Sequence, residues 1–158
     1  SRELMKRMEI KGVEAAYVTM HLGQGNFREI DVEDLTKHKT DSEQMFVERE
    51  ATEIVNKAKS EGHKVCAIGT SVMRVLETAV GADDRLKEYE GWTNKFIFPP
   101  YDFRFADALI TNLHMPYSTM LMLTAAYGGY DLIMQAYDAA LEGDYRFGAY
   151  GDAMLIID

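Results

Sequence analysis

Short β-rich runs alternate with helical segments along this chain, and that alternation is the feature that most constrains the fold. We predict strands at residues 15–22, 65–68, 95–98, 108–111 and 153–157. We predict helices at residues 2–11, 48–60, 70–80 and 116–127, and a further helix that Asp131 caps. Alternating strands and helices are typical of an α/β domain with a mostly parallel sheet flanked by helices.

Apolar spacing and capping residues define these helices further. In segment 48–60 the spacing i, i+3, i+4, i+7 predicts a buried stripe of Ala51, Ile54, Val55 and Ala58. Thr70 or Ser71 is the expected N-cap of the helix that follows strand 65–68. In the last helix the residues expected to face inward are Leu132, Ile133, Ala136, Tyr137 and Ala140.

Composition narrows the possible settings and partners. The chain has 158 residues, which suits one compact domain or a large piece of one. The formal net charge is −9, and residues 80–158 hold 5 Lys and Arg against 12 Asp and Glu. Because nucleic-acid binders usually carry a basic patch, this chain alone is a poor electrostatic match for a polyanion. No apolar run reaches the ~18 residues of a membrane span.

The cysteine and histidine positions restrict redox and metal chemistry. Cys66 is the one cysteine, so an internal disulfide is excluded and a reduced, cytoplasmic setting is expected. Cys66 lies within an apolar run, which favours a buried, inert thiol. The four histidines show no HxxxH spacing, so a zinc site would need carboxylates and scattered histidines. A GxSxG elbow and a Walker loop are also absent from the sequence.

Polar segments follow three of the predicted strands. His21 leads into Gly23 and Gly25 after the first strand. Gly69, Thr70 and Ser71 follow the second strand, with Arg74 and Glu77 one and two turns into the next helix. Thr111, Asn112 and His114 follow the third, shortly before Ser118. If these strands are parallel in one sheet, the segments share one edge, which is where ligands bind in such sheets.

Each of these features also has a purely structural interpretation. The glycines form a common tight turn, and Arg28 stands where a GxGxxG fingerprint needs its third glycine. Either histidine can be a satisfied core residue. Arg74 and Glu77, spaced i,i+3 on a helix, can simply pair, or Arg74 can clamp a carboxylate or phosphate. Asp107 can cap a turn before its strand.

Several segments read together resemble one family, the S-adenosylmethionine:tRNA ribosyltransferase-isomerases of queuosine biosynthesis. The matching stretches lie at residues 17–27 (YVTMHLGQGNF), 67–77 (AIGTSVMRVLE), 91–123 (GWTNKFIFPPYDFRFADALITNLHMPYSTMLML) and 145–156 (YRFGAYGDAMLI). Their order and spacing agree along nearly the whole chain. Family members are roughly twice as long. The resemblance therefore implies that residues 1–158 are the C-terminal part of the family's α/β domain, without the N-terminal half and the inserted small β-barrel domain.

The resemblance also implies a reaction and its partners. S-adenosylmethionine would donate its ribosyl unit to the 7-aminomethyl-7-deazaguanine wobble base of a tRNA with a GUN anticodon. Isomerisation of the ribose would give epoxyqueuosine, with release of adenine and methionine. The family implies a cytoplasmic enzyme without metal or membrane, as a monomer or homodimer. The missing half would supply much of the RNA-binding surface, which reconciles an acidic chain with an RNA substrate.

Residue roles follow only where the family motifs match. Forming a sulfonium ylide needs a base, and losing adenine needs an acid, so His21 and His114 are the candidate acid and base, in either order. The residues that the matched motifs assign to cosubstrate or substrate binding are Gly23, Gly25, Thr70, Arg74, Glu77, Asp107, Thr111, Asn112, Ser118 and Asp152.

Four positions depart from the family pattern, namely Thr40, Val72, Pro100 and Tyr117. Val72 replaces a hydroxyl-bearing residue, and Tyr117 replaces a lysine at a helix start. These departures leave open a different function, in which a divergent paralogue keeps the fold as a nucleotide- or partner-binding module without the chemistry.

Overall fold

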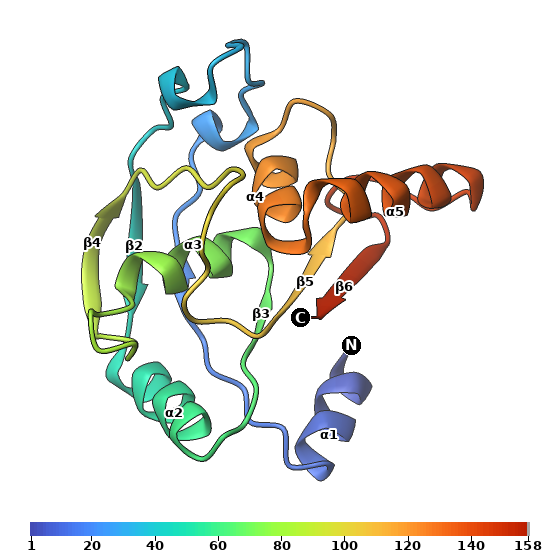
Figure 1. The fold of residues 1–158 in the computed structure, drawn as a ribbon. Helices are drawn as coiled ribbons and strands as arrows, with labels where there is room; N and C mark the ends of the chain where they lie inside the picture. The colour runs from blue at the N-terminus through green and yellow to red at the C-terminus, as the bar shows by residue number, and fades with distance from the viewer. Residues whose placement is uncertain (158) are drawn as a thin grey trace.

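The computed structural model describes residues 1–157, which form two three-stranded sheets and five α-helices (Figure 1). The helices are α1 (Arg2–Ile10), α2 (Arg49–Ser60), α3 (Thr70–Ala79), α4 (Thr119–Gly128) and α5 (Tyr130–Glu142). The strands are β1 (Thr19–Met20), β2 (Glu43–Val47), β3 (Cys66–Ile68), β4 (Tyr89–Thr93), β5 (Ala108–Asn112) and β6 (Ala153–Ile157). The predicted α/β class is confirmed.

The pairing of the strands differs from the predicted mostly parallel sheet. In the described chain β3 and β5 are parallel, whereas β6 runs antiparallel to β5. The other sheet has the order β1-β2-β4 and is antiparallel throughout. β1 therefore lies in a different sheet from β3 and β5, so the three polar segments do not share one sheet edge as predicted. Alternation of helices with strands constrains the layers of a fold but not the direction of each strand pair.

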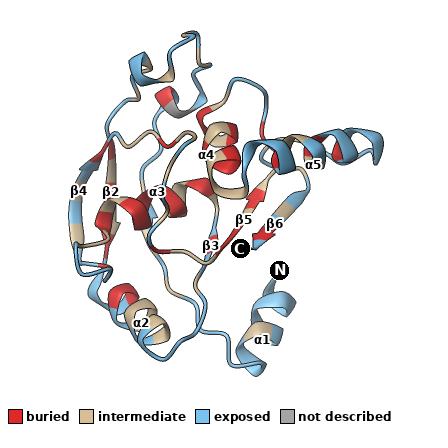
Figure 2. Cartoon of the chain, viewed as in Figure 1, coloured by how far each residue is buried: buried red, intermediate tan, exposed pale blue. Residues whose placement is uncertain are grey.

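Helix α3 packs between the two sheets and supplies much of the core (Figures 1 and 2). Met73, Val75 and Leu76 of this helix are almost completely buried. They meet Met45 of β2 on one side and Leu109 of β5 on the other within a single core cluster of the described residues. This arrangement explains why the polar residues of α3 lie next to both sheets.

The structure corrects one predicted strand and the predicted burial of one residue. Residues 95–98 form no strand, and side chains donate to carbonyls at and just before this segment. Thr40 Oγ1 donates to the Asn94 carbonyl at 2.6 Å, and Arg74 Nε donates to the Lys95 carbonyl at 3.0 Å. The strand of this region is β4, a few residues earlier. Leu132 was expected to face inward, but it is exposed on α5.

The starts of α1, α2 and α3 agree with the prediction to within one residue, whereas the starts of α4 and α5 and the N-cap of α3 differ from it. Gly69, and not Thr70 or Ser71, is the N-cap of α3. Pro116 precedes α4, whose N-cap is Ser118. Gly129 is the N-cap of α5, and Asp131 lies in its first turn, where a carboxylate interacts favourably with the helix dipole. The elements were recognised correctly, and their ends depend on backbone geometry that the pattern does not encode.

One face of the β3-β5-β6 sheet is left exposed by the described residues, 1–157. Helices α3 and α4 pack against the other face, which presents Ala67, Leu109 and Ile156. The outer face carries exposed apolar side chains, among them Ile68, Leu155 and Ile157. Cys66 lies on this face and is exposed, so the predicted burial of its thiol is wrong. Partial burial still raises the pKa of the Cys66 thiol.

Candidate functional site

A buried ion pair in the candidate site joins the β1-β2-β4 sheet to helix α3. Arg74 Nη1 of α3 donates to Glu43 Oε2 of β2 at 2.7 Å, and both side chains are buried. Glu43 Oε1 accepts the Gly23 amide at 2.8 Å. The glycine segment after β1 is thereby fixed beside α3, although β1 and β3 belong to different sheets.

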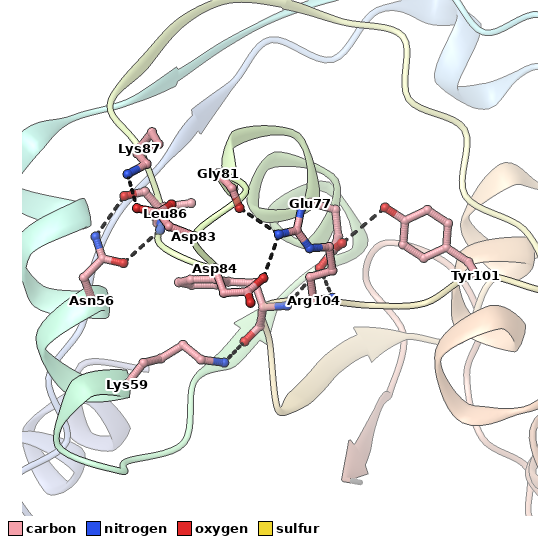
Figure 3. A network of polar contacts seen from close by, with 11 residues as sticks. Asn56, Lys59, Glu77, Gly81, Asp83, Asp84, Leu86, Lys87, Tyr101 and Arg104 are labelled. Atoms are coloured by element: carbon pink, nitrogen blue, oxygen red, sulfur yellow. Dashed lines mark hydrogen bonds and ion pairs between the residues drawn. The ribbon is translucent and has the colours of Figure 1, made fainter.

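Arg74 does not pair with Glu77, as the helical spacing had suggested. Glu77 is buried, and its Oε1 accepts the backbone amides of Arg104 and Phe105 at 3.0 and 3.2 Å (Figure 3). Its Oε2 accepts the Tyr101 hydroxyl at 3.2 Å. Burial, together with this carboxylate, raises the pKa of Tyr101 to about 12. Glu77 therefore anchors the 101–105 segment and is occupied by the protein's own donors.

A small cavity of about 10 Å³, which has room for about one water-sized group, opens to solvent between the first turns of α3 and α4. Its lining consists of Thr70, Ser71, Arg74, Thr119, Met120 and Leu123. Thr70 and Arg74 were predicted site residues, whereas Thr119 was not. The cavity thus combines hydroxyl groups and a guanidinium with two apolar side chains.

His114 occupies a buried position directly after β5. Its Nε2 lies 2.6 Å from Thr111 Oγ1, and its backbone amide donates to the Tyr137 hydroxyl at 2.8 Å. Burial lowers the pKa of His114 to about 4, so the imidazole is neutral at physiological pH. A neutral imidazole can accept a proton. It cannot act as the acid, because the cationic form that would donate a proton is not populated at this pH.

His21 differs from His114 in its surroundings. It is exposed at the end of β1, where its backbone amide donates to the Gln44 carbonyl at 2.8 Å. Its ring meets the Phe46 ring edge-on with centroids 5.9 Å apart. His21 is next to the Gly23–Glu43 contact in sequence, and its imidazole is open to a ligand.

Three further predicted residues form hydrogen bonds near the carboxyl end of β5 or the start of α4, and a fourth, Gly25, lies after β1. Ser118 Oγ accepts the Leu121 amide at 3.1 Å and so caps α4. Asn112 Nδ2 donates to the Asp152 carbonyl at 3.2 Å, and Asp152 Oδ2 accepts the Arg146 amide at 2.8 Å. Gly25 lies so close to Asp41 that a Cβ there would clash with its side chain.

Asp107 lies at the opposite end of β5 from the cavity and His114. Its Oδ2 accepts the Val65 amide at 2.8 Å, and its Oδ1 is 3.6 Å from Lys59 Nζ. Because a strand rises ~3.3 Å per residue, Asp107 is roughly 13 Å from Thr111 along β5. The structure therefore separates Asp107 from the other predicted site residues.

Sequence reasoning missed Glu43, Ser71 as a cavity residue, and Thr119. Glu43 carried a detectable signal, since a charged residue begins the alternating run EQMFV of strand β2. Ser71 and Thr119 each lie in the first turn of a helix that was predicted, but their shared cavity exists only through tertiary packing.

Among residues 1–157, no group of His, Cys, Asp and Glu side chains is arranged to hold a metal ion. No helix in that range has the length and apolarity needed to cross a membrane.

Comparison with known proteins places the chain in a family. A family model described as queuosine biosynthesis protein matches residues 1–156. The S-adenosylmethionine:tRNA ribosyltransferase-isomerase of Phocaeicola vulgatus is 71% identical over 158 residues, which is 100% of this chain and 45% of that protein. The protein of the same name from Cytophaga hutchinsonii is 54% identical over 157 residues.

A solved structure agrees with this assignment. The crystal structure of S-adenosylmethionine tRNA ribosyltransferase from Thermotoga maritima superposes with a TM-score of 0.82 at 37% identity. The match covers 99% of this chain and 50% of that one. The chain thus spans about half the length of the relatives it matches. Residues 1–156 and their fold show that this chain belongs to the queuosine biosynthesis protein family.

Proposed function

We propose that this chain is the C-terminal part of the α/β catalytic domain of an S-adenosylmethionine:tRNA ribosyltransferase-isomerase. The observation that carries the proposal is the family match over residues 1–156, supported by relatives of that name at up to 71% identity. The matched relatives extend well beyond this chain, which corresponds to 45% of their length. The N-terminal half and a small inserted β-barrel domain belong to that additional length.

The proposed reaction uses S-adenosylmethionine as a ribosyl donor. The ribosyl unit is transferred to the 7-aminomethyl-7-deazaguanine wobble base of a tRNA with a GUN anticodon and is isomerised to give epoxyqueuosine. Adenine and methionine are released, and the reaction takes place in the cytoplasm. The net charge of −9 indicates that most of the tRNA contacts lie outside this chain.

The structure favours different tasks for the two histidines. Proton transfer at the cosubstrate needs a group within hydrogen-bond reach of the reacting atoms. His21 is exposed at the end of β1, and we assign it to such a transfer. His114 is buried against Thr111 and Tyr137, and we assign it to positioning the segment between β5 and α4.

The test of the proposed function uses the protein at the full length of its family. It is incubated with labelled S-adenosylmethionine and with tRNA that carries the aminomethyl-deazaguanine base. Free adenine and a mass gain on the wobble nucleoside are the expected products. The matched control is the same tRNA with unmodified guanine at that position, which should release no adenine.

Variants then test the residue assignments. His21→Ala should lower kcat while S-adenosylmethionine binding persists, and His63→Ala, at an exposed histidine outside the matched stretches, is its control. A folded protein that binds the cosubstrate but releases no adenine would contradict the proposed reaction. That outcome would favour a binding module in which Val72 and Tyr117 mark the loss of chemistry.

A further inference from the structure

The cavity between α3 and α4 contains a buried hydroxyl for which the described residues offer no partner. Thr119 is the first residue of α4, 9% of its surface is exposed, and its side chain lines the cavity. Its Oγ1 is buried, and among the described residues no group forms a hydrogen bond with it. Buried polar atoms are nearly always hydrogen-bonded, and exceptions need an explanation. A ligand atom in the cavity explains this one.

The two helix starts make the cavity suitable for an anion. α3 and α4 each have ten residues, and the first-turn amides of such helices lack partners within the helix. The N-cap of α3 is Gly69, which has no side chain to satisfy these amides. Both helix dipoles present their positive ends at the cavity, and this favours a bound oxyanion.

The residues that line the cavity indicate what attracts an anion and which chemical group can be attached to it. Arg74 lines the cavity, but its Nη1 is paired with Glu43 and its Nε with the Lys95 carbonyl. The pair is neutral overall, so the attraction for an anion comes from the helix ends and the hydroxyl groups. Met120 and Leu123 form the apolar part of the lining, which suits an aliphatic or thioether chain attached to the anion.

We propose that this cavity binds the α-carboxylate of the methionine part of S-adenosylmethionine. Thr119 Oγ1 donates to the carboxylate, and Met120 and Leu123 contact the carbon chain that leads to sulfur. The inference rests on the proposed function for the identity of the ligand. It adds a binding subsite and a specificity-determining residue, Thr119, which lies in a matched family stretch but was not among the assigned site residues.

A backbone phosphate of tRNA is the other source of an oxyanion. Phosphate contacts in nucleic-acid complexes usually come from several Lys and Arg side chains. Among the cavity-lining residues Arg74 is the cation, and it is already paired with Glu43. The apolar lining and the burial of Thr119 therefore favour the carboxylate.

The experiment compares two probes with the full-length protein. S-adenosylhomocysteine keeps the amino-acid carboxylate, whereas methylthioadenosine keeps the nucleoside and the thioether without it. Thr119→Val should weaken S-adenosylhomocysteine binding about tenfold or more, because it removes a hydrogen bond to a charged group. Methylthioadenosine affinity should stay unchanged. Thr119→Ser, which keeps the hydroxyl, should bind both probes like the unmodified protein.

A matched control and a second readout keep the test independent of folding. Thr124→Val changes a buried threonine on the same helix whose hydroxyl already donates to the Met120 carbonyl at 2.8 Å, and it should leave both affinities unchanged. Without ligand, Thr119→Val should not lower the Tm, because no hydrogen bond within the protein is lost. If Thr119→Val fails to fold, Ser71→Ala gives the same comparison from the α3 side.

The outcomes separate this proposal from the proposed function. Equal S-adenosylhomocysteine affinity in Thr119→Val and the unmodified protein would overturn the carboxylate subsite even if adenine is released normally. Weaker tRNA binding with unchanged S-adenosylhomocysteine affinity would assign the cavity to a phosphate and also overturn it. Selective loss of S-adenosylhomocysteine binding would support the subsite even in a protein that transfers no ribosyl group.

Discussion

The Glu43 carboxylate and the Arg74 guanidinium form a buried ion pair that ties the antiparallel sheet to helix α3. Oε2 and Nη1 are 2.7 Å apart, and the two side chains are 4% and 9% exposed. The same carboxylate holds the Gly23 amide through Oε1. One pair of residues thus fixes the position of the glycine segment relative to the cavity.

Breaking this pair should strongly destabilise the protein. Arg74→Met leaves the Glu43 carboxylate buried without its cation, and we expect the free energy of unfolding to fall by about 3–5 kcal/mol. Urea unfolding followed by circular dichroism measures the loss. The exposed pair Arg49–Glu53 provides the control, and Arg49→Met should leave the unfolding midpoint nearly unchanged.

A double variant tests whether Glu43 and Arg74 stabilise the protein as a pair or independently of each other. Glu43→Leu combined with Arg74→Met should be less destabilised than the sum of the single changes, because neither charge remains buried alone. Additive losses would show that the two side chains act separately.

Replacing Glu77 should loosen the 101–105 segment. Glu77→Leu removes the acceptor of the Arg104 and Phe105 amides and leaves them without a partner, which should cost about 2–4 kcal/mol. Tyr101→Phe removes the hydrogen bond to Glu77 and the one from Lys95 Nζ, and should cost about 1–2 kcal/mol. Unfolding midpoints measure both effects, and hydrogen exchange at the Phe105 amide reports the local change.

Tyr89→Phe is the matched control for Tyr101→Phe. The Tyr89 hydroxyl donates to the Trp92 carbonyl at an exposed position, so its loss should have little effect. Equal effects of the two changes would argue against a special role of the Glu77 carboxylate.

The neutral state of His114 should make stability depend on pH. Burial lowers the pKa of His114 to about 4 in the folded protein, against 6.5 for an ordinary histidine. The unfolded chain therefore binds the proton first, and the stabilising contribution is present above pH 6.5 and is lost as the pH falls toward 4. Linkage gives a total loss of about 3 kcal/mol over that window.

His114→Gln removes this titration. The difference in unfolding free energy between the unmodified protein and the variant should shrink as the pH falls from 6.5 to 4. Urea titrations at half-unit pH steps measure it. Parallel profiles for the two proteins would show that His114 titrates normally.

Cys66 should react with a thiol reagent in the folded chain. Its side chain is exposed on the outer face of the β3-β5-β6 sheet, so one equivalent of reagent should be consumed without denaturant. Partial burial raises its pKa, so the reaction at pH 8 should be slower than that of a free cysteine. Reaction only after denaturation would contradict the exposed position, and Cys66→Ser gives the background.

Local patterns in the sequence predicted the elements that depend on neighbouring residues. The 3.6-residue apolar spacing located α2, and turn residues bounded β3, β5 and β6. Strands β2 and β4 were not predicted, and they pair with each other across more than forty residues. Residues 95–98 have strand-like composition but form no strand, and the Arg74 side chain donates to the Lys95 carbonyl there.

The sequence by itself determined the α/β class, the family resemblance and most of the polar residues around the candidate site. Tertiary structure alone decided how those residues are used. It paired Arg74 with Glu43 instead of Glu77, moved Asp107 to the far end of β5, and left the Thr119 hydroxyl facing a cavity. Helical spacing and motif position describe contacts within a few residues. Ion pairs and cavities arise between segments that approach only when the chain has folded.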